Sequence, residues 1–153
     1  MKLITDDIIH FFHKQSFVIV STVDANLCPH NSCKGIVHMD AEGDVYLLDL
    51  YKARTHANLE RNPHISITAV DEHKFKGYCL KGIARLVPEK KINSNIIKAW
   101  EEKIAKRLAR RVLKEIRQEI GHPEYPEAAL PKPEYMIVMR VEEVIDLAPH
   151  LTK

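Results

Sequence analysis

The residues with the clearest chemical potential follow an apolar segment, Val45–Leu50. Lys52, Arg54 and Thr55 come directly after it and begin a short helix that must end before Asn62-Pro63. Cationic side chains, a hydroxyl and unpaired backbone N–H groups at a helix start bind anions, because the helix dipole also favours negative charge there. The pattern predicts an anion site. The alternative interpretation of these residues is an ordinary solvated helix start without a ligand. It has to be considered because helix starts are far more common than ligand sites.

Cysteine and histidine residues gather in a second stretch. Its members are Cys28, His30, Cys33 and His38. Their spacing matches no known chelating pattern, so we expect no metal site. The sequence also has no Gly-Lys-Ser/Thr phosphate loop, no nucleophile elbow and no paired catalytic carboxylates. No catalytic residue can therefore be assigned from motifs.

Composition describes an ordinary globular chain. Its 153 residues are 45% hydrophobic and 29% charged, which fits a single domain over 1–153. The net charge of +2 is too small to indicate nucleic acid, and no apolar run reaches the ~20 residues of a membrane span. Three cysteines, an odd number, and the absence of an apolar leader argue against a disulfide framework. We expect a cytoplasmic protein that binds neither nucleic acid nor membranes.

The pattern of β-branched and alternating residues predicts six strands. They span 17–23, 30–37, 45–50, 64–70, 77–87 and 135–141. Most loops are of hairpin length, so we expect a mainly β, six-stranded antiparallel barrel of Greek-key type, because closure removes the edge strands. Gly82 predicts a bend or bulge in the fifth strand. A helix to about Lys14, capped by Thr5, precedes the barrel, and the helix 53–61 follows the third strand.

Residues 88–133 interrupt the strands with a helical and proline-rich insertion. Pro88 can start the helix, and Gly121 with Pro123 can end it. Apolar residues recur there with helical spacing, at Ile97, Trp100, Ile104, Leu108, Val112 and Ile116. The stretch from Lys98 to Arg117 holds eight Lys/Arg and three Glu. It could bind nucleic acid or a membrane, but a solvated basic face opposite a core-packing or dimer-packing stripe is the favoured interpretation.

Several weak motifs occur in an order that resembles a known family. They are Pro29 before a polar strand, Gly43-Asp44-Val45-Tyr46-Leu47, Arg54-Thr55-His56-Ala57-Asn58-Leu59 before Asn62-Pro63, and Lys81-Gly82-Ile83-Ala84. Together with the final strand they resemble the FMN-binding split barrels, the pyridoxamine 5′-phosphate oxidase-like superfamily, and most of all its small FMN-binding proteins. The resemblance covers about residues 3–87 and 135–147.

This resemblance implies a homodimer with FMN at the subunit interface. Arg54 and Thr55 match the positions that bind the flavin phosphate, and Asn58 matches a structural asparagine. The cofactor-binding candidates that follow from the comparison and from the needs of a flat ring are Asn31, Ser32, Cys33, Lys34, Leu48, Asp49, Leu50, Lys52, Arg54 and Thr55. Trp100 is a further candidate for the slot that holds the ring.

The sequence departs from the oxidase that names the superfamily. The Ser-Arg-Lys triplet typical of that enzyme is Ala53-Arg54-Thr55 here, and Arg140 is the only arginine in the last 19 residues. We therefore do not expect pyridoxamine phosphate as the substrate. The expected function is a flavin-dependent oxidoreductase that uses FMN and takes electrons from a nicotinamide or another donor. The alternatives are a flavin carrier or redox sensor, a haem-binding protein, a deazaflavin-dependent reductase, or FAD in place of FMN.

Overall fold

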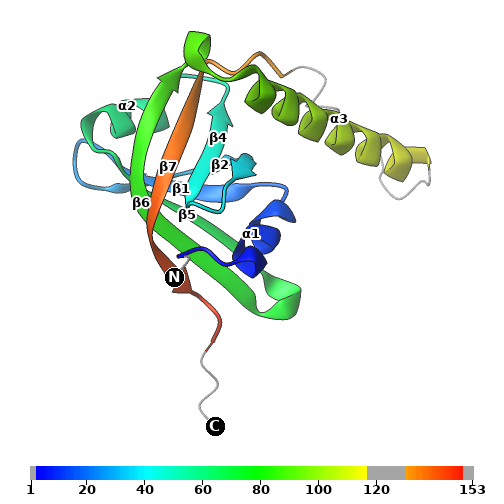
Figure 1. Cartoon of the computed structure of the whole chain (residues 1–153), viewed down its shortest axis with the longest axis horizontal. Helices are drawn as coiled ribbons and strands as arrows, with labels where there is room; N and C mark the ends of the chain where they lie inside the picture. Colours follow the sequence, from blue (N-terminus) through cyan, green and yellow to red (C-terminus); the bar gives the residue numbers. More distant parts are fainter. Residues whose placement is uncertain (1–2, 117–129, 150–153) are drawn as a thin grey trace.

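A computed structural model describes residues 3–116 and 130–149 of the protein and is organised around one antiparallel sheet (Figure 1). The helices are α1 (Asp6–His13), α2 (Arg54–Arg61) and α3 (Ser94–Ile116). The strands are β1 (Val18–Val23), β2 (Pro29–Lys34), β3 (Ile36–Met39), β4 (Asp44–Asp49), β5 (His64–Asp71), β6 (Lys76–Pro88) and β7 (Tyr135–Asp146). Their order across the sheet is β2-β1-β5-β6-β7-β4-β3. The predicted mainly β, antiparallel fold is confirmed.

The two edge strands of this order, β2 and β3, are consecutive in the chain and are joined only by Gly35. β2 pairs with β1, whereas β3 pairs with β4. The strand predicted at 30–37 therefore bends at Gly35 and pairs with a different neighbour on each side of the bend. This bend gives seven strands instead of the predicted six. It also connects the two edges of the curled sheet, as a barrel requires.

The inner face of the sheet forms the main core. Its most deeply buried side chains include Val20, Leu47, Ile67, Leu80 and Ile137, which come from five different strands. From α1, the residues Ile8, Phe11 and Phe12 pack against the same cluster. Burial of each such large apolar side chain stabilises the fold by about 1.5–3 kcal/mol. Thr5 precedes α1 as predicted, but its side chain makes no capping hydrogen bond.

β6 and β7 are the longest strands, and their pairing corrects two sequence predictions. Pro88 does not begin the long helix: it ends β6, opposite Tyr135, and caps a 3-10 helix, Glu89–Lys91, that separates β6 from α3. β7 continues to Asp146, five residues beyond the predicted end, because its ladder with β6 extends that far. The register of this ladder shifts between Lys81 and Gly82, which is the bulge expected at the glycine.

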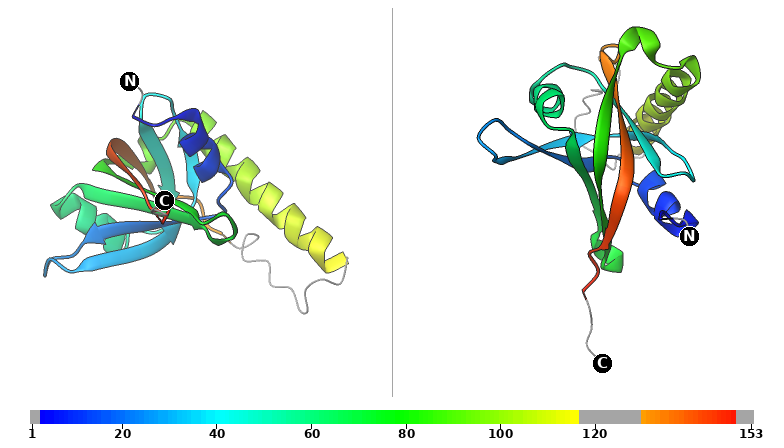
Figure 2. Two further views of the ribbon diagram at one scale, coloured as in Figure 1. Left: turned by 90° about the horizontal axis from the view of Figure 1, so that it is seen from below. Right: turned by 60° about the vertical axis from the view of Figure 1, so that its left-hand side comes forward.

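α3 leaves the barrel at an angle and extends beyond it (Figures 1 and 2). Its first half packs on a second apolar cluster formed by β3, β4, β6 and β7, where Ile96, Ile97 and Trp100 are half-buried. Farther along, the side chains of Val112 and Ile116 are 38% and 72% exposed. Among the described residues, the predicted apolar stripe is therefore partly buried from Ile97 to Leu108 and exposed at Val112 and Ile116. The predicted stop of the helix, at Gly121, lies outside the described residues.

Gly82 is required for the close approach of β6 to β7. A Cβ atom at this position would lie 1.9 Å from the carbonyl oxygen of Arg140, a backbone atom that cannot move away cheaply. We predict that Gly82→Ala lowers the free energy of unfolding by at least about 2 kcal/mol. Equilibrium denaturation measures this change. Gly35→Ala is the control, with a change below about 1 kcal/mol, because no atom lies within 4 Å of its added Cβ. Equal effects of the two substitutions would contradict the account.

Candidate functional site

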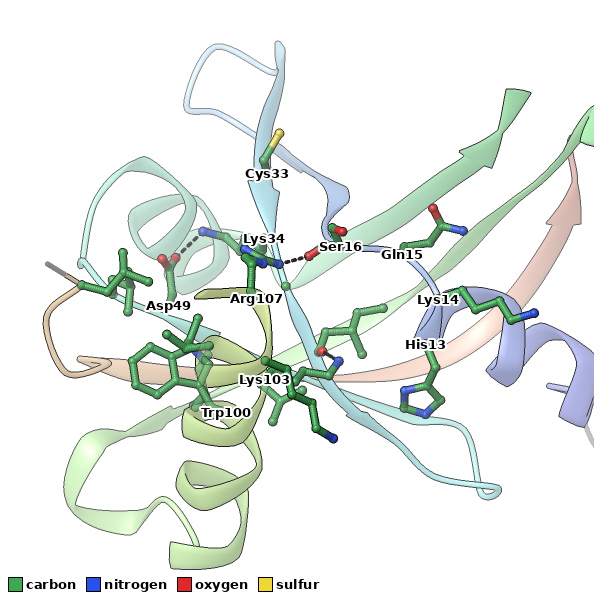
Figure 3. Close-up of a pocket in the computed structure, with 18 of the residues that line it drawn as sticks. His13, Lys14, Gln15, Ser16, Cys33, Lys34, Asp49, Trp100, Lys103 and Arg107 are labelled. Carbon is green, nitrogen blue, oxygen red and sulfur yellow. Dashed lines mark hydrogen bonds and ion pairs between the residues drawn. The ribbon is translucent and has the colours of Figure 1, made fainter. Parts of the chain in front are cut away.

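A pocket lies where the strand bends at Gly35, between β2, the end of β4, the segment after α1, and α3 (Figure 3). Its volume is about 790 Å³, within the range of small-molecule and cofactor sites. Leu48, Leu50 and Trp100 give one end an apolar lining. His13 and Lys14 lie toward the other end, as Figure 3 shows. The pocket therefore has a partly apolar end and a polar end.

An ion pair between Lys34 and Asp49 lies in the wall of the pocket. The two side chains are only 9% and 15% exposed. Tyr135 donates a hydrogen bond of 2.5 Å from its hydroxyl to Oδ2 of the same carboxylate. Burial, together with the neighbouring Asp49, raises the pKa of Tyr135 well above its usual range, so this hydroxyl remains a donor. The ring of His56 packs edge-on against Tyr135, at 4.7 Å between centroids. Lys34 is therefore held in one position.

The α3 wall of the pocket is basic. Lys103 donates a hydrogen bond to the carbonyl oxygen of Ile36, and Arg107 donates one to that of Ser16. Burial lowers the pKa of Lys103, and the charge of Arg107 lowers it further. These two contacts fix α3 to β3 and to the segment after α1.

The start of α2 offers donors without a capping side chain. Ala53 occupies the N-cap position and provides no side-chain hydrogen bond, and the first helical bond is from the N–H of Ala57 to the carbonyl of Ala53. Arg54 is exposed beside these N–H groups. Thr55 is buried, and its hydroxyl lies 3.1 Å from that of Ser32. Lys52 is exposed, and its backbone N–H donates a 2.7 Å hydrogen bond to Glu134. This helix start is therefore able to receive an anion.

The pocket brings together five of the ten predicted cofactor-binding residues, and Trp100 with them. These five are Cys33, Lys34, Leu48, Asp49 and Leu50. The other five do not line it. Ser32 and Thr55 contact each other, and Lys52 and Arg54 follow Tyr51, which is itself part of the lining. Asn31 is exposed on β2 and accepts a 2.7 Å hydrogen bond from Ser21. Asn58, predicted to be structural, is buried and donates to Thr22 at 3.0 Å.

Sequence reasoning expected Trp100 at the pocket, but it missed the basic residues of α3 and the residues from the end of α1 onward. The missed polar residues are His13, Lys14, Gln15, Ser16, Lys103, Lys106, Arg107 and Arg110. Four of them are on α3, and their spacing of three, one and three residues places them on one face of the helix. This spacing was visible in the sequence. The basic side of the helix was instead interpreted as a solvated face, because nothing in the sequence showed that it would face the bent strand.

Two further features complete the description of possible sites. A second pocket, of about 460 Å³, lies over β1, β5 and β6, where Ser21, Ser66 and Lys81 contribute to its lining. Among the described residues, no three His, Cys, Asp or Glu side chains gather as a metal site requires. No helix in the described ranges is long and apolar enough to span a membrane.

The Lys34–Asp49 pair generates a prediction on stability. Asp49→Ala leaves the Lys34 ammonium buried without its counterion, so we expect a loss of about 3 kcal/mol in the free energy of unfolding. Adding Lys34→Met removes the buried charge, so the double variant should lose less than the sum of the single losses. Chemical denaturation of all three variants measures the coupling.

The matched control is the cross-strand pair Lys81–Glu143. Its atoms are 3.4 Å apart, but the side chains are about half exposed. Glu143→Ala should therefore change the free energy of unfolding by less than about 0.5 kcal/mol. Strict additivity of the Lys34 and Asp49 substitutions would show that their ion pair does not matter.

Comparisons with known proteins agree with this architecture. The sequence model of the family described as pyridoxamine 5′-phosphate oxidase matches residues 4–147. No curated protein matches the sequence. Among solved structures, HupZ of Group A Streptococcus is 20% identical, with a TM-score of 0.64 over 95% of this chain and 94% of that chain. HutZ, the haem storage protein of Vibrio cholerae, is 24% identical, with a TM-score of 0.53 over 95% and 94% of the two chains.

A structure named F420 reductase is 15% identical, with a TM-score of 0.51 over 84% of this chain and 88% of that chain. At these identities the structural similarities support the fold, whereas the family match extends over nearly the whole sequence. The protein therefore belongs to the pyridoxamine 5′-phosphate oxidase family and has its split-barrel fold.

Proposed function

We propose that the protein binds FMN and acts as a flavin-dependent oxidoreductase, as a homodimer. The observation that carries this proposal is the position of the pocket beside the start of α2. Leu50 and Tyr51 line the pocket, and Arg54 follows three residues later at the uncapped helix start. A ligand with a flat ring and an anionic tail fits such an arrangement. Family members bind flavin, deazaflavin or haem.

The pocket lining fits an isoalloxazine ring. Leu48, Leu50 and Trp100 provide apolar surface for the faces of the ring. Lys34 and the backbone at the Gly35 bend provide polar groups for its nitrogen and oxygen edges. A few polar groups within a mostly apolar lining are typical of cofactor sites, because they fix the orientation of the ligand.

The start of α2 fits the phosphate of FMN, which carries nearly two negative charges at neutral pH. The exposed guanidinium of Arg54 and the first N–H groups of α2 are donors of the kind that bind phosphate. The hydroxyl of Thr55 is buried against Ser32, so it is oriented by this contact. Lys52 adds positive charge nearby.

The ion pair gives Lys34 a defined role in this proposal. When bound, FMN would supply the redox chemistry, and the protein would control its orientation and access. Asp49 and Tyr135 hold the ammonium of Lys34 at the pocket wall, where it favours negative charge on a bound ring. A nicotinamide is the electron donor that we propose.

A homodimer is proposed because family members are commonly dimers and because one sheet face is suited to association. Across the outer face of β2, β1, β5 and β6, the paired residues Cys33, Ile19, Thr68 and Cys79 form a row without charge. Ile19 is 37% exposed in this row. An uncharged, partly apolar patch of this kind is typical of interfaces.

Haem is the second candidate, because the fold resembles that of HutZ, a haem storage protein. The absorption spectrum of the purified protein separates the candidates. Flavin bands that are bleached by reduced nicotinamide support the proposal, and flavin bands that are not bleached favour a carrier. A Soret band after addition of haem, without flavin binding, would overturn it in favour of haem. A deazaflavin-dependent reductase would bind F420 in preference to FMN.

Arg54→Ala tests the phosphate position. We predict that FMN binding weakens by about 1–3 kcal/mol, because a charge-assisted hydrogen bond to the phosphate is lost. Calorimetric titration with FMN measures the difference. Arg85→Ala, which removes an exposed arginine of β6 outside both pockets, should leave the affinity unchanged. Unchanged FMN affinity in Arg54→Ala would rule out this position for the phosphate.

Ile19→Arg tests the proposed dimer. A charge in the uncharged row should dissociate the dimer, because an unpaired buried charge is costly at an interface. Sedimentation equilibrium should then give the mass of a monomer, and FMN affinity should fall at the same time. Phe75→Arg, the same change at an exposed turn residue, should leave the dimer intact. A dimer of unchanged stability in Ile19→Arg would place the interface elsewhere.

A further inference from the structure

We propose that the basic end of the main pocket is a second anion site, which binds a polyanionic small molecule beside the flavin. The proposal rests on the proposed flavin function and identifies the chemical class of the second substrate. The site is formed by Lys14, Lys103, Lys106, Arg107 and Arg110. Two or more phosphate or carboxylate charges on one small ligand are the chemistry that this site recognises.

The charges in the pocket lining do not balance. Among the described residues, six lysine and arginine side chains line the pocket, and Asp49 provides the single carboxylate. This carboxylate is already paired with Lys34. The other five cations therefore have no counterion among the described residues of the lining. Such a concentration of positive charge in a concave site attracts anionic ligands, because the low-dielectric walls focus the field.

The cations on α3 occupy one face of the helix. Lys106 and Arg107 each lie three or four residues from Lys103 on one side and from Arg110 on the other. Side chains at these spacings are neighbours on a helix, so the like charges repel one another. Burial lowers the pKa of Lys103, and the charge of Arg107 lowers it further, which agrees with repulsion between these cations. A bound anion would relieve it.

Two of the five cations of the proposed site are held by hydrogen bonds within the protein, and the other three are available to bind a ligand. Lys103 and Arg107 donate to the backbone carbonyls of Ile36 and Ser16, so α3 and its charges keep a fixed position against the bent strand (Figure 3). Within the described ranges, the side chains of Lys14, Lys106 and Arg110 make no hydrogen bond or ion pair. A preorganised wall with unused donors is suited to ligand binding.

The flavin phosphate does not account for these cations. In the proposed orientation the phosphate lies at the start of α2, beyond the end of the pocket that Leu50 and Tyr51 line. The basic residues extend along α3 from Lys103, about one turn after Trp100, to Arg110. The rise of an α-helix places Arg110 about 15 Å from Trp100 along the axis. A second ligand that contacts both the ring and this wall would fill the pocket.

The test is calorimetric titration with inorganic pyrophosphate, NADH and NADPH, using the full chain with and without FMN. Lys106→Gln with Arg110→Gln removes two of the available cations. Pyrophosphate and NADPH affinity should fall at least about tenfold, while FMN affinity should stay within about twofold of the wild type. NADPH, with its extra phosphate, should lose more than NADH.

The matched control is Lys90→Gln with Lys98→Gln, which removes the same charge from exposed residues outside the pocket. It should leave all affinities within about twofold. An equal loss in the control, or no pyrophosphate binding by the wild type, would overturn the second anion site. Loss of FMN affinity in the Lys106/Arg110 variant would also overturn it, because these cations would then hold the flavin phosphate. Pyrophosphate binding that depends on Lys106 and Arg110 without any FMN binding would support the site and refute the flavin function.

Discussion

The ion pair between Lys34 and Asp49 is the interaction on which the pocket depends. Lys34 is the last residue of β2, and Asp49 is the last residue of β4, so the pair joins two strands across the bend at Gly35. Tyr135 adds β7 to the same carboxylate through its hydroxyl. The ends of β2, β4 and β7 are thereby fixed around the carboxylate of Asp49, which is largely buried. A buried pair of this kind is costly to break, because either partner alone would remain an unpaired charge.

The bend itself determines where a ligand can enter. A regular strand at 29–39 would pair with one neighbour along its whole length and leave no opening. β2 pairs with β1, whereas β3 pairs with β4, so the sheet opens at Gly35 between them. α3 and the segment after α1 cover part of this opening. The resulting pocket is electrostatically uneven. Among the described residues that line it, Asp49 neutralises Lys34, whereas the cations of α3 have no acidic partner.

Much of the barrel could be predicted from the sequence, because its strands are dense in β-branched residues and bounded by turn residues. The bulge at Gly82 was predicted for the same kind of reason, since a glycine within a long strand marks a bend or a close approach. The bend at Gly35 was not predicted. Strand residues continue on both sides of it, polar before Gly35 and mostly apolar after it, and the change of pairing partner is what divides the strand.

The candidate site was predictable only where residues are close in sequence. Cys33 and Lys34, like Leu48, Asp49 and Leu50, are local groups next to a motif, and the structure places them in one pocket. The pairing of Lys34 with Asp49 and Tyr135 is long-range, so no local pattern could indicate it. The role of α3 depends on its direction after the turn at Glu89–Lys91, which the helical spacing does not determine.

The most direct test of the account compares FMN with riboflavin, which differ only in the phosphate. Fluorescence titration of the purified protein with each flavin measures the two dissociation constants. The account predicts that FMN binds and that riboflavin binds at least about tenfold more weakly, because it lacks the anion that the start of α2 receives. Equal affinity for the two flavins, or no binding of either, would contradict it.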